Sequence, residues 1–97
     1  MTEEHLIELN KMQKDLKVHP IIYRDLWVYA VAYTHGVPNQ QLRDEYSYQI
    51  VKRALTKVDK KYVGRNGNRD YTMRNYSESL VKETMEELGI KEKKRVL

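Results

Sequence analysis

The sequence contains no cysteine and no phenylalanine, and its 97 residues include only one tryptophan, four glycines and two prolines. Without cysteine, neither a disulfide framework nor thiolate chemistry is available. The longest apolar run, LWVYAVAY at 26–33, is far too short to span a membrane. The first residues, MTEEHLIELNK, lack the basic segment and apolar run typical of a signal peptide. These absences predict a cytoplasmic protein with no membrane association.

Residue patterns typical of catalysis or cofactor binding are also missing. His5, His19 and His35 fall in different predicted elements, and no cysteine can join them in a metal site. Neighbouring carboxylates such as Glu3 and Glu4 point in different directions on a helix, so they form no acid/base pair. Glycine-rich phosphate-binding motifs are absent as well. We therefore expect no enzyme, no cofactor and no metal ion.

The composition is that of one folded domain, because 40% of the residues are hydrophobic and 33% are charged. The predicted domain covers residues 1–90, and the charged residues 91–97 form a C-terminal tail. The predicted fold is mainly α, a compact bundle of four to five helices with one β-hairpin at about residues 60–73.

The first predicted helix is amphipathic. Apolar residues recur at spacings of three and four, which predicts a single buried stripe made of Leu6, Leu9, Met12 and Leu16.

The second predicted helix, Pro20–Thr34, is apolar on nearly every side. This pattern predicts a central helix buried on several faces. Its expected centre consists of Leu26, Trp27, Ala30 and Val31. Gly36 is expected to end the helix in a left-handed conformation.

The third predicted segment, 38–58, keeps helical phase from Leu42 to Val58 and allows two interpretations. It is either one continuous helix or two short helices broken near 45–48. The second interpretation gives a helix-turn-helix in which Tyr48–Val58 enters a major groove.

The predicted hairpin is centred on Asn66 and Gly67, the dipeptide most typical of a two-residue type I′ turn. This register places Tyr62 opposite Tyr71. An isolated hairpin is only marginally stable in water, so its tyrosine face is expected to lie against the helices. A last helix is expected to be capped by Asn75 or Ser77 and to end at Gly89, with Ile90 packing back.

Positive charge is concentrated in one segment of the chain. Residues 1–51 contain five Lys or Arg against seven Asp or Glu, and residues 75–97 contain five of each. Residues 52–74 contain eight against two, so they carry all the excess positive charge. Such a segment favours an anionic partner.

The sequence therefore predicts a small nucleic-acid-binding protein, a regulatory or accessory factor that uses the helix and hairpin of residues 52–74. A basic helix followed by a basic hairpin is the order of parts in a winged helix-turn-helix, a fold-level analogy. Gln49 and Arg53 are the candidates for reading base edges. The candidates for phosphate contacts are Lys52, Lys57, Lys60, Lys61, Arg65, Arg69 and Arg74.

The alternative prediction is a small protein–protein interaction module, which would bind through a tyrosine-rich surface and the hairpin. An adaptor or an inhibitor of a host protein, of the kind that phages and mobile elements encode, fits this size. The apolar first helix also allows pairing with a second copy of the chain, which would give a homodimer.

Overall fold

Four helices make up the part of the protein that the computed structural model describes, residues 3–59 and 71–92, with only the backbone of Tyr71 and Thr72. They are α1 (Glu3–Asp15), α2 (Pro20–Thr34), α3 (Gln40–Leu55) and α4 (Tyr71–Leu88). No strand occurs among these residues. The prediction of a mainly helical globule is confirmed. None of the described helices combines the length and apolarity that crossing a membrane requires.

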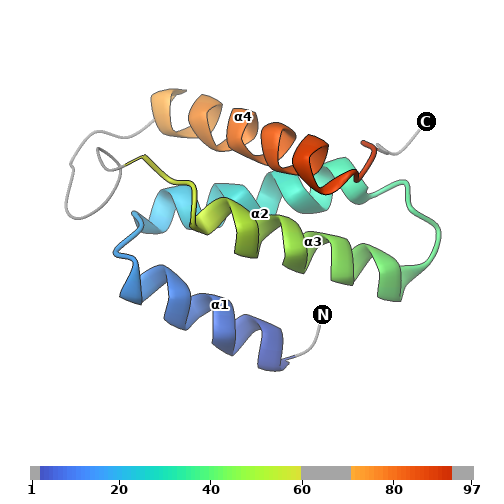
Figure 1. Ribbon diagram of the computed structural model, residues 1–97, viewed down its shortest axis with the longest axis horizontal. Coiled ribbons are helices and arrows are strands. Elements are labelled where there is room, and N and C mark those ends of the chain that lie inside the picture. The colour runs from blue at the N-terminus through green and yellow to red at the C-terminus, as the bar shows by residue number, and fades with distance from the viewer. Residues whose placement is uncertain (1–2, 60–70, 93–97) are drawn as a thin grey trace.

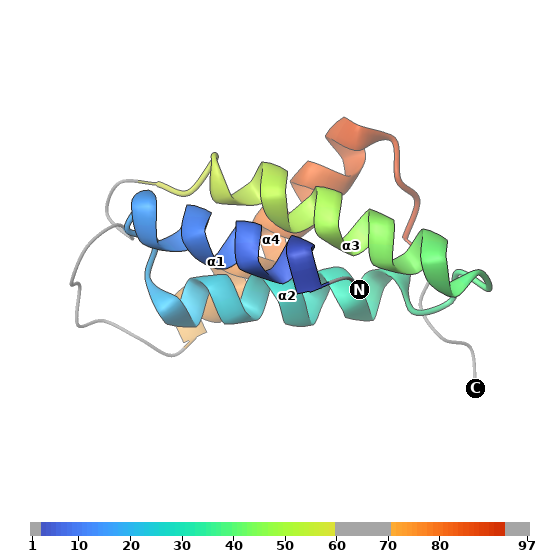
Figure 2. The same ribbon diagram turned by 90° about the horizontal axis from the view of Figure 1, so that it is seen from below.

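The helices form three layers (Figure 1). α2 and α3 lie side by side in the middle, α4 covers one side of this pair, and α1 covers the other. Seen from below, α1 lies over the pair but does not reach the connection between α2 and α3 (Figure 2). α2 contacts both α3 and α4 extensively, whereas the main neighbour of α1 is α3. The core therefore lies between α2, α3 and α4.

The predicted bounds of α2 are confirmed. His19 caps its start, because the His19 Nδ1 accepts a hydrogen bond of 3.1 Å from the Ile21 N–H. Pro20 follows as the first helical residue, where its missing N–H leaves no hydrogen bond unmade.

α2 packs against several neighbours as predicted, but its predicted centre is correct only in part. Leu26 and Ala30 are completely buried, but Trp27 is only partly buried and Val31 is exposed. Val28 is exposed as well. The reason is geometric: α1, α3 and α4 cover only part of the circumference of α2, so an apolar strip on it remains in contact with water.

The predicted stripe of α1 is buried only in part. Leu9 is the one fully buried residue of the helix, and Met12 packs partly against the core. Leu6 and Leu16 are both more than 40% exposed. α1 is thus anchored by a single large side chain.

α1 and α4 end in the same hydrogen-bond motif. At the end of α4, the Ile90 N–H donates to the Met85 carbonyl at 2.9 Å, and Gly89 has φ 72°. This is the predicted Schellman-type end, with Ile90 buried. At the end of α1, the Val18 N–H donates to the Gln13 carbonyl at 3.1 Å. Lys17 takes the left-handed position there, with φ 57°.

Replacing Lys17 with glycine is expected to stabilise the protein by about 0.5–1 kcal/mol, because a side chain in the left-handed region is strained and glycine is not. This corresponds to an increase in Tm of roughly 2–8 °C for a domain of this size. Thermal unfolding followed by circular dichroism measures it. Lys14→Gly, in the last turn of the same helix, is the matched control and should destabilise by about 1 kcal/mol. Equal losses for both variants would contradict the assigned backbone conformation.

The left-handed conformation predicted for Gly36 is wrong. Among the described residues only Lys17 and Gly89 have positive φ. α2 instead ends with His35 in a right-handed conformation and a turn closed by the Val37 N–H, which donates to the Thr34 carbonyl at 3.0 Å. Val37 is buried, so the chain turns inward without needing a left-handed residue.

α3 is one continuous helix, which confirms the first interpretation of segment 38–58. Asn39 caps it by accepting a 3.0 Å hydrogen bond from the Leu42 N–H. The helix-turn-helix interpretation is wrong because there is no break near 45–48; Ser47 lies buried inside the helix. The predicted winged helix-turn-helix therefore lacks its recognition helix.

The predicted hairpin is also not supported. Tyr71, Thr72 and Met73 were expected in its second strand, but they form the first turn of α4, and Met73 is buried in the core. The other hairpin residues, 60–70, lie outside the described residues. The predicted caps Asn75 and Ser77 are inside α4, and the Ser77 hydroxyl donates to the Met73 carbonyl at 2.8 Å.

Candidate interaction surfaces

The basic residues of α3 that were predicted to contact nucleic acid form ion pairs with neighbouring helices. The Lys52 ammonium lies 2.9 Å from a Glu8 carboxylate oxygen of α1. Tyr48 joins the pair, because its hydroxyl donates to the other Glu8 oxygen at 2.8 Å and accepts from Lys52 at 3.1 Å. His5 stacks on the Tyr48 ring, with 3.9 Å between the centroids. This cluster connects α1 to α3.

Arg53 and Lys57 contact α4 instead. The Arg53 Nε lies 2.6 Å from one Glu87 carboxylate oxygen, and Lys57 pairs with the other. Lys57 also lies 3.6 Å from Glu83. Lys52 and Arg53 thus point to two sides of α3, and Lys57, just beyond the end of α3, faces the same carboxylate as Arg53.

The remaining predicted contact residues are placed as follows. The Gln49 amide donates to Glu45 at 3.0 Å within α3. Arg74 is exposed in the first turns of α4. The other four, Lys60, Lys61, Arg65 and Arg69, lie outside the described residues. Arg53 and Lys57 therefore lie together beside α4, whereas Lys52 lies beside α1.

These ion pairs shift the pKa values of their members. The hydrogen bond from Lys52, followed by that from Tyr48, lowers the pKa of Glu8 below its ordinary value. The hydrogen bond from Lys57, followed by that from Arg53, lowers the pKa of Glu87. The same contacts raise the pKa values of Lys52 and Lys57. All four groups are therefore charged at neutral pH.

Acid is expected to weaken the attachment of α1 and α4 to α3. Because the folded-state pKa values of Glu8 and Glu87 lie below their unfolded values, their stabilising effect is present above the unfolded pKa of about 4.3. It is lost as the pH falls through the folded-state values. Tm should be nearly constant from pH 6 to 8 and fall below about pH 4.5. Glu87→Gln should flatten this fall, and Glu86→Gln, its exposed neighbour, should not; identical profiles would contradict the assignment.

The described tyrosines do not form an exposed surface. Tyr33 is buried, and the partly buried tyrosines pack against the core: Tyr23, Tyr29, Tyr46, Tyr48 and Tyr76. Several of their hydroxyls reach polar partners at the edge of the core. The six described tyrosines therefore pack at the edge of the core, and the side chains of Tyr62 and Tyr71 lie outside the described residues; the tyrosine-rich binding surface stays a prediction.

Tyr33 shows how a buried hydroxyl is satisfied. Its hydroxyl donates to a carboxylate oxygen of Glu78, which connects α2 to α4. Burial, followed by this hydrogen bond, raises the pKa of Tyr33 far above its ordinary value. The Tyr33 phenol is therefore uncharged throughout the physiological pH range, and its role is to connect the two helices.

The clearest candidate surface is apolar and lies on α1 and α2. We call it the α1–α2 face; its members are Leu6, Ile7, Trp27, Val28 and Val31. Ile7 is 61% exposed, Val28 53%, Val31 47% and Leu6 42%, and Trp27 is partly buried beside the core. Within residues 3–59 and 71–92, the other large exposed apolar side chains are Leu16, Leu42 and Leu88, which lie outside this face.

Helix geometry brings these five side chains together. α1 and α2 run in opposite directions, and the Tyr23 hydroxyl donates to Asn10 at 2.7 Å between them. Leu6 lies one turn before Asn10, and Trp27 lies one turn after Tyr23, so Leu6 and Trp27 are at the same level. Val31 continues the column one turn further along α2. Leu6, Trp27 and Val31 thus follow the line along which the two helices face each other, and Ile7 and Val28 lie beside it, about a quarter turn further round their helices.

Trp27 has an unusual position in this strip. Its indole N–H is buried and finds no hydrogen-bond acceptor among the described residues. Buried tryptophan N–H groups normally have a partner. As the only tryptophan of the chain, Trp27 also provides a fluorescence signal specific to this face.

The sequence contained a signal for this face that periodicity alone did not resolve. Ile7 falls outside the spacing of three and four that links Leu6 to Leu9. α2 also carries more apolar positions than one buried side of a helix can hold. Both features indicate apolar side chains beyond the needs of the core.

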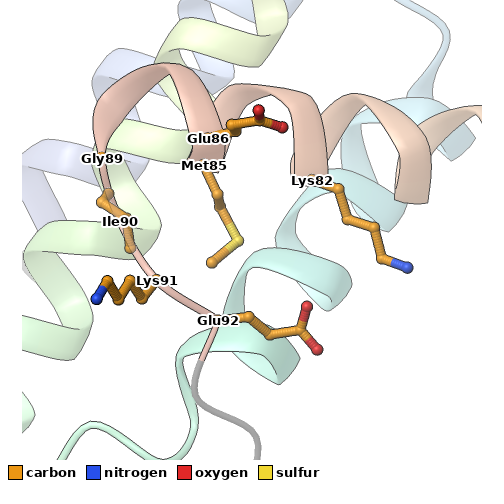
Figure 3. A pocket seen from close by; sticks show the side chains of 7 residues that line it. All are labelled: Lys82, Met85, Glu86, Gly89, Ile90, Lys91 and Glu92. Carbon is orange, nitrogen blue, oxygen red and sulfur yellow. The ribbon is translucent and has the colours of Figure 1, made fainter.

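A pocket of about 470 Å³ lies at the end of α4. The Met85 side chain points into it, Lys82 and Glu92 extend to the same side, and Lys91 extends to the other (Figure 3). Its lining residues are Lys82, Met85, Glu86, Gly89, Ile90, Lys91 and Glu92. Two lysines and two glutamates balance each other, so the electrostatics of the pocket favour neither an anion nor a cation.

No group of three or more histidine, aspartate or glutamate side chains suited to a metal ion occurs within residues 3–59 and 71–92. The chain matches no protein-family model, and comparisons with curated proteins and with solved structures give no significant match.

Proposed function

We propose that this protein acts by binding another protein chain through the α1–α2 face. The observation that carries the proposal is the exposure of four aliphatic side chains beside Trp27 on one strip of two helices. Water contact with such a strip is unfavourable, at about 25 cal/mol per Å² of apolar surface. Contiguous exposed apolar patches mark interaction sites in soluble proteins. Partly buried tryptophan is also among the residues that contribute most to interface energy.

The ion pairs of α3 support this choice over a basic binding face. Lys52, Arg53 and Lys57 each have a carboxylate partner within the described chain. A phosphate group would have to compete with that partner. The α1–α2 face has no such competitor, because its outward side chains are aliphatic.

Site-specific photocrosslinking in cells tests the proposal. A photoreactive p-benzoylphenylalanine in place of Val28 is expected to give a discrete protein adduct. The same residue in place of Leu42, which is 41% exposed on α3, is the matched control and should give none. The crosslinked protein, identified and purified, should bind the wild-type chain and lose at least about tenfold affinity for Val31→Asp. No adduct at position 28, or equal adducts at both positions, would overturn the proposal.

Nucleic-acid binding is a second candidate, supported by the charge of residues 52–74. Eight basic residues stand there against two acidic ones. With Lys52, Arg53 and Lys57 paired, this candidate rests on the other predicted phosphate contacts, Lys60, Lys61, Arg65, Arg69 and Arg74. This candidate would involve backbone contacts and little base reading.

Affinity for duplex DNA or RNA at low and moderate salt tests this second candidate. Binding should weaken steeply between 50 and 200 mM salt, by about 10- to 1,000-fold for a few phosphate contacts. Arg65→Ala combined with Arg69→Ala should weaken it on all sequences alike. Absence of binding at low salt would remove the candidate.

A further inference from the structure

We infer that α1 of one copy exchanges with α1 of a second copy, so that the chain forms a domain-swapped dimer. The exchange takes place on the surface of α2 and α3 that α1 covers. We call this surface the α1 site; it includes Tyr23, Tyr48 and Lys52. The α1 site is distinct from the α1–α2 face, so the inference goes beyond the proposed function.

α1 is held in place by few buried contacts. Leu9 is its one fully buried residue, and its main neighbour is α3, not α2, which follows it in sequence. The Glu8–Lys52 ion pair lies at an exposed position, where such pairs contribute little. The Asn10–Tyr23 hydrogen bond is exposed as well. An element with few buried contacts opens at a lower free energy than the core, so α1 detaches while α2, α3 and α4 stay packed.

The segment 16–19, which joins α1 to α2, is short and strained. Lys17 has φ 57°, in the left-handed region where a side chain is unfavourable. The turn is closed by the Val18 N–H, which donates to the Gln13 carbonyl at 3.1 Å. Water replaces such a hydrogen bond at a modest net cost, whereas an extended backbone at Lys17 removes the strain. Short hinges under strain favour domain swapping.

Pro20 determines the form of the opened chain. The residue before a proline avoids the helical region, and His19 has φ −57° and ψ 133°. α1 and α2 therefore do not merge into one continuous helix when the turn opens. α1 becomes an arm joined to α2 by an extended segment, residues 16–19, which spans up to about 13 Å.

The contacts between α1 and α3 select α1 of a second copy as the replacement. The His5 ring stacks on Tyr48, whose hydroxyl donates to Glu8. Lys52 pairs with the same carboxylate. Tyr48 follows Glu8 by 40 residues, so these contacts do not require that both helices belong to one chain. α1 of a second copy carries the same groups and restores every contact that detachment breaks, which makes domain swapping a low-cost route to a dimer.

Disulfide trapping between two full-length chains tests the inference, because the wild-type chain contains no cysteine. One chain carries His5→Cys, and a second, isotope-labelled chain carries Tyr48→Cys. They are mixed in a glutathione buffer at about 1 mM, the order of the effective concentration that a short link gives its own segment. A disulfide-linked heterodimer is expected, because positions 5 and 48 of different chains are adjacent in the swapped dimer.

Leu42→Cys in place of Tyr48→Cys is the matched control. Position 42 is exposed and lies about 9 Å further along α3, so it should give only the low yield of random collisions. Absence of the heterodimer, or equal yields from positions 48 and 42, would overturn the inference.

Lys17→Gly gives an independent readout of the hinge. Glycine is unstrained in the left-handed region, so the closed turn becomes more favourable than the opened one. With the substitution in both chains, the heterodimer yield should fall by about 2- to 5-fold for each hinge that opens. Lys14→Gly weakens α1 alike in the monomer and in the swapped dimer, so it should leave the yield nearly unchanged. A yield that Lys17→Gly does not lower overturns the inference, because the disulfide then forms without opening of the turn.

A second pair of cysteine variants, Glu8→Cys with Lys52→Cys, guards against a local effect of the first pair. The two side chains lie 2.9 Å apart in the structure, so they should also give a heterodimer. Circular dichroism verifies that each variant remains folded. Heterodimers from both pairs support the swap, and folded chains that give a heterodimer with one pair or with neither overturn it. An adduct between position 28 and a different protein supports the proposed function in either case.

Discussion

Leu26→Ala is expected to destabilise the protein by about 3–5 kcal/mol, the largest effect of any single substitution considered. Leu26 is fully buried in α2, the helix that contacts both α3 and α4. Removing a buried leucine side chain loses its transfer free energy and leaves a cavity that rigid neighbours only partly fill. Tm should fall by roughly 12–40 °C, as measured by calorimetry or circular dichroism.

Val28→Ala, two residues away on the same helix, is the control for this loss. Val28 is exposed, so its truncation should change the free energy of unfolding of the monomer by less than about 0.5 kcal/mol. The same substitution should weaken binding at the α1–α2 face. Comparable losses of stability for Leu26→Ala and Val28→Ala would mean that the exposed strip is part of the core. The pair thus separates side chains that fold the protein from those that bind its partner.

The contrast between these two positions also shows what the sequence could predict. Local signals were sufficient to predict the bounds of α2 and the Schellman-type end of α4. Pro20 and Gly89 determine these ends because each affects only the backbone conformation and hydrogen bonds close to it in sequence. Periodicity likewise identified Leu9 and Leu26 as core residues.

Which side of each helix is buried depends on the helices that pack against it, and no local sequence pattern specifies these. Val31 and Leu26 both belong to an apolar run, yet only the positions of α1, α3 and α4 determine which of them is covered. The same holds for charge: Lys52 and Arg53 are adjacent in sequence, but they pair with different helices. The predicted basic site could therefore not reveal that its cations hold helices together.

The hairpin prediction failed at Tyr71–Met73 for a related reason. The Asn66-Gly67 dipeptide favours a turn wherever it occurs, but strand pairing after it competes with the helix that follows. In α4, the Met73 side chain is buried in the core, and the Met73 carbonyl accepts a hydrogen bond from the Ser77 hydroxyl. In the helix, Met73 lies on the same buried side as Leu80 and Val81. The free energy gained by this burial outweighs that of a two-stranded hairpin, which is only marginally stable.

The second large effect is expected for Leu9→Ala, which removes the one fully buried side chain of α1. The loss should be about 2–4 kcal/mol, but it should be local. The other contacts of α1 include the exposed Glu8–Lys52 pair and the Asn10–Tyr23 hydrogen bond, which contribute modestly.

Hydrogen exchange should therefore show faster exchange throughout α1 in Leu9→Ala, while the core amides of α2, α3 and α4 keep most of their protection. Ile7→Ala, at an exposed position of the same helix, should leave α1 protected in the monomer. Because α1 supplies Leu6 and Ile7 to the α1–α2 face, Leu9→Ala should also weaken binding at that face without unfolding the other three helices. If all four helices lost protection together, α1 would be an integral part of the core, and loss of binding would then follow from unfolding alone.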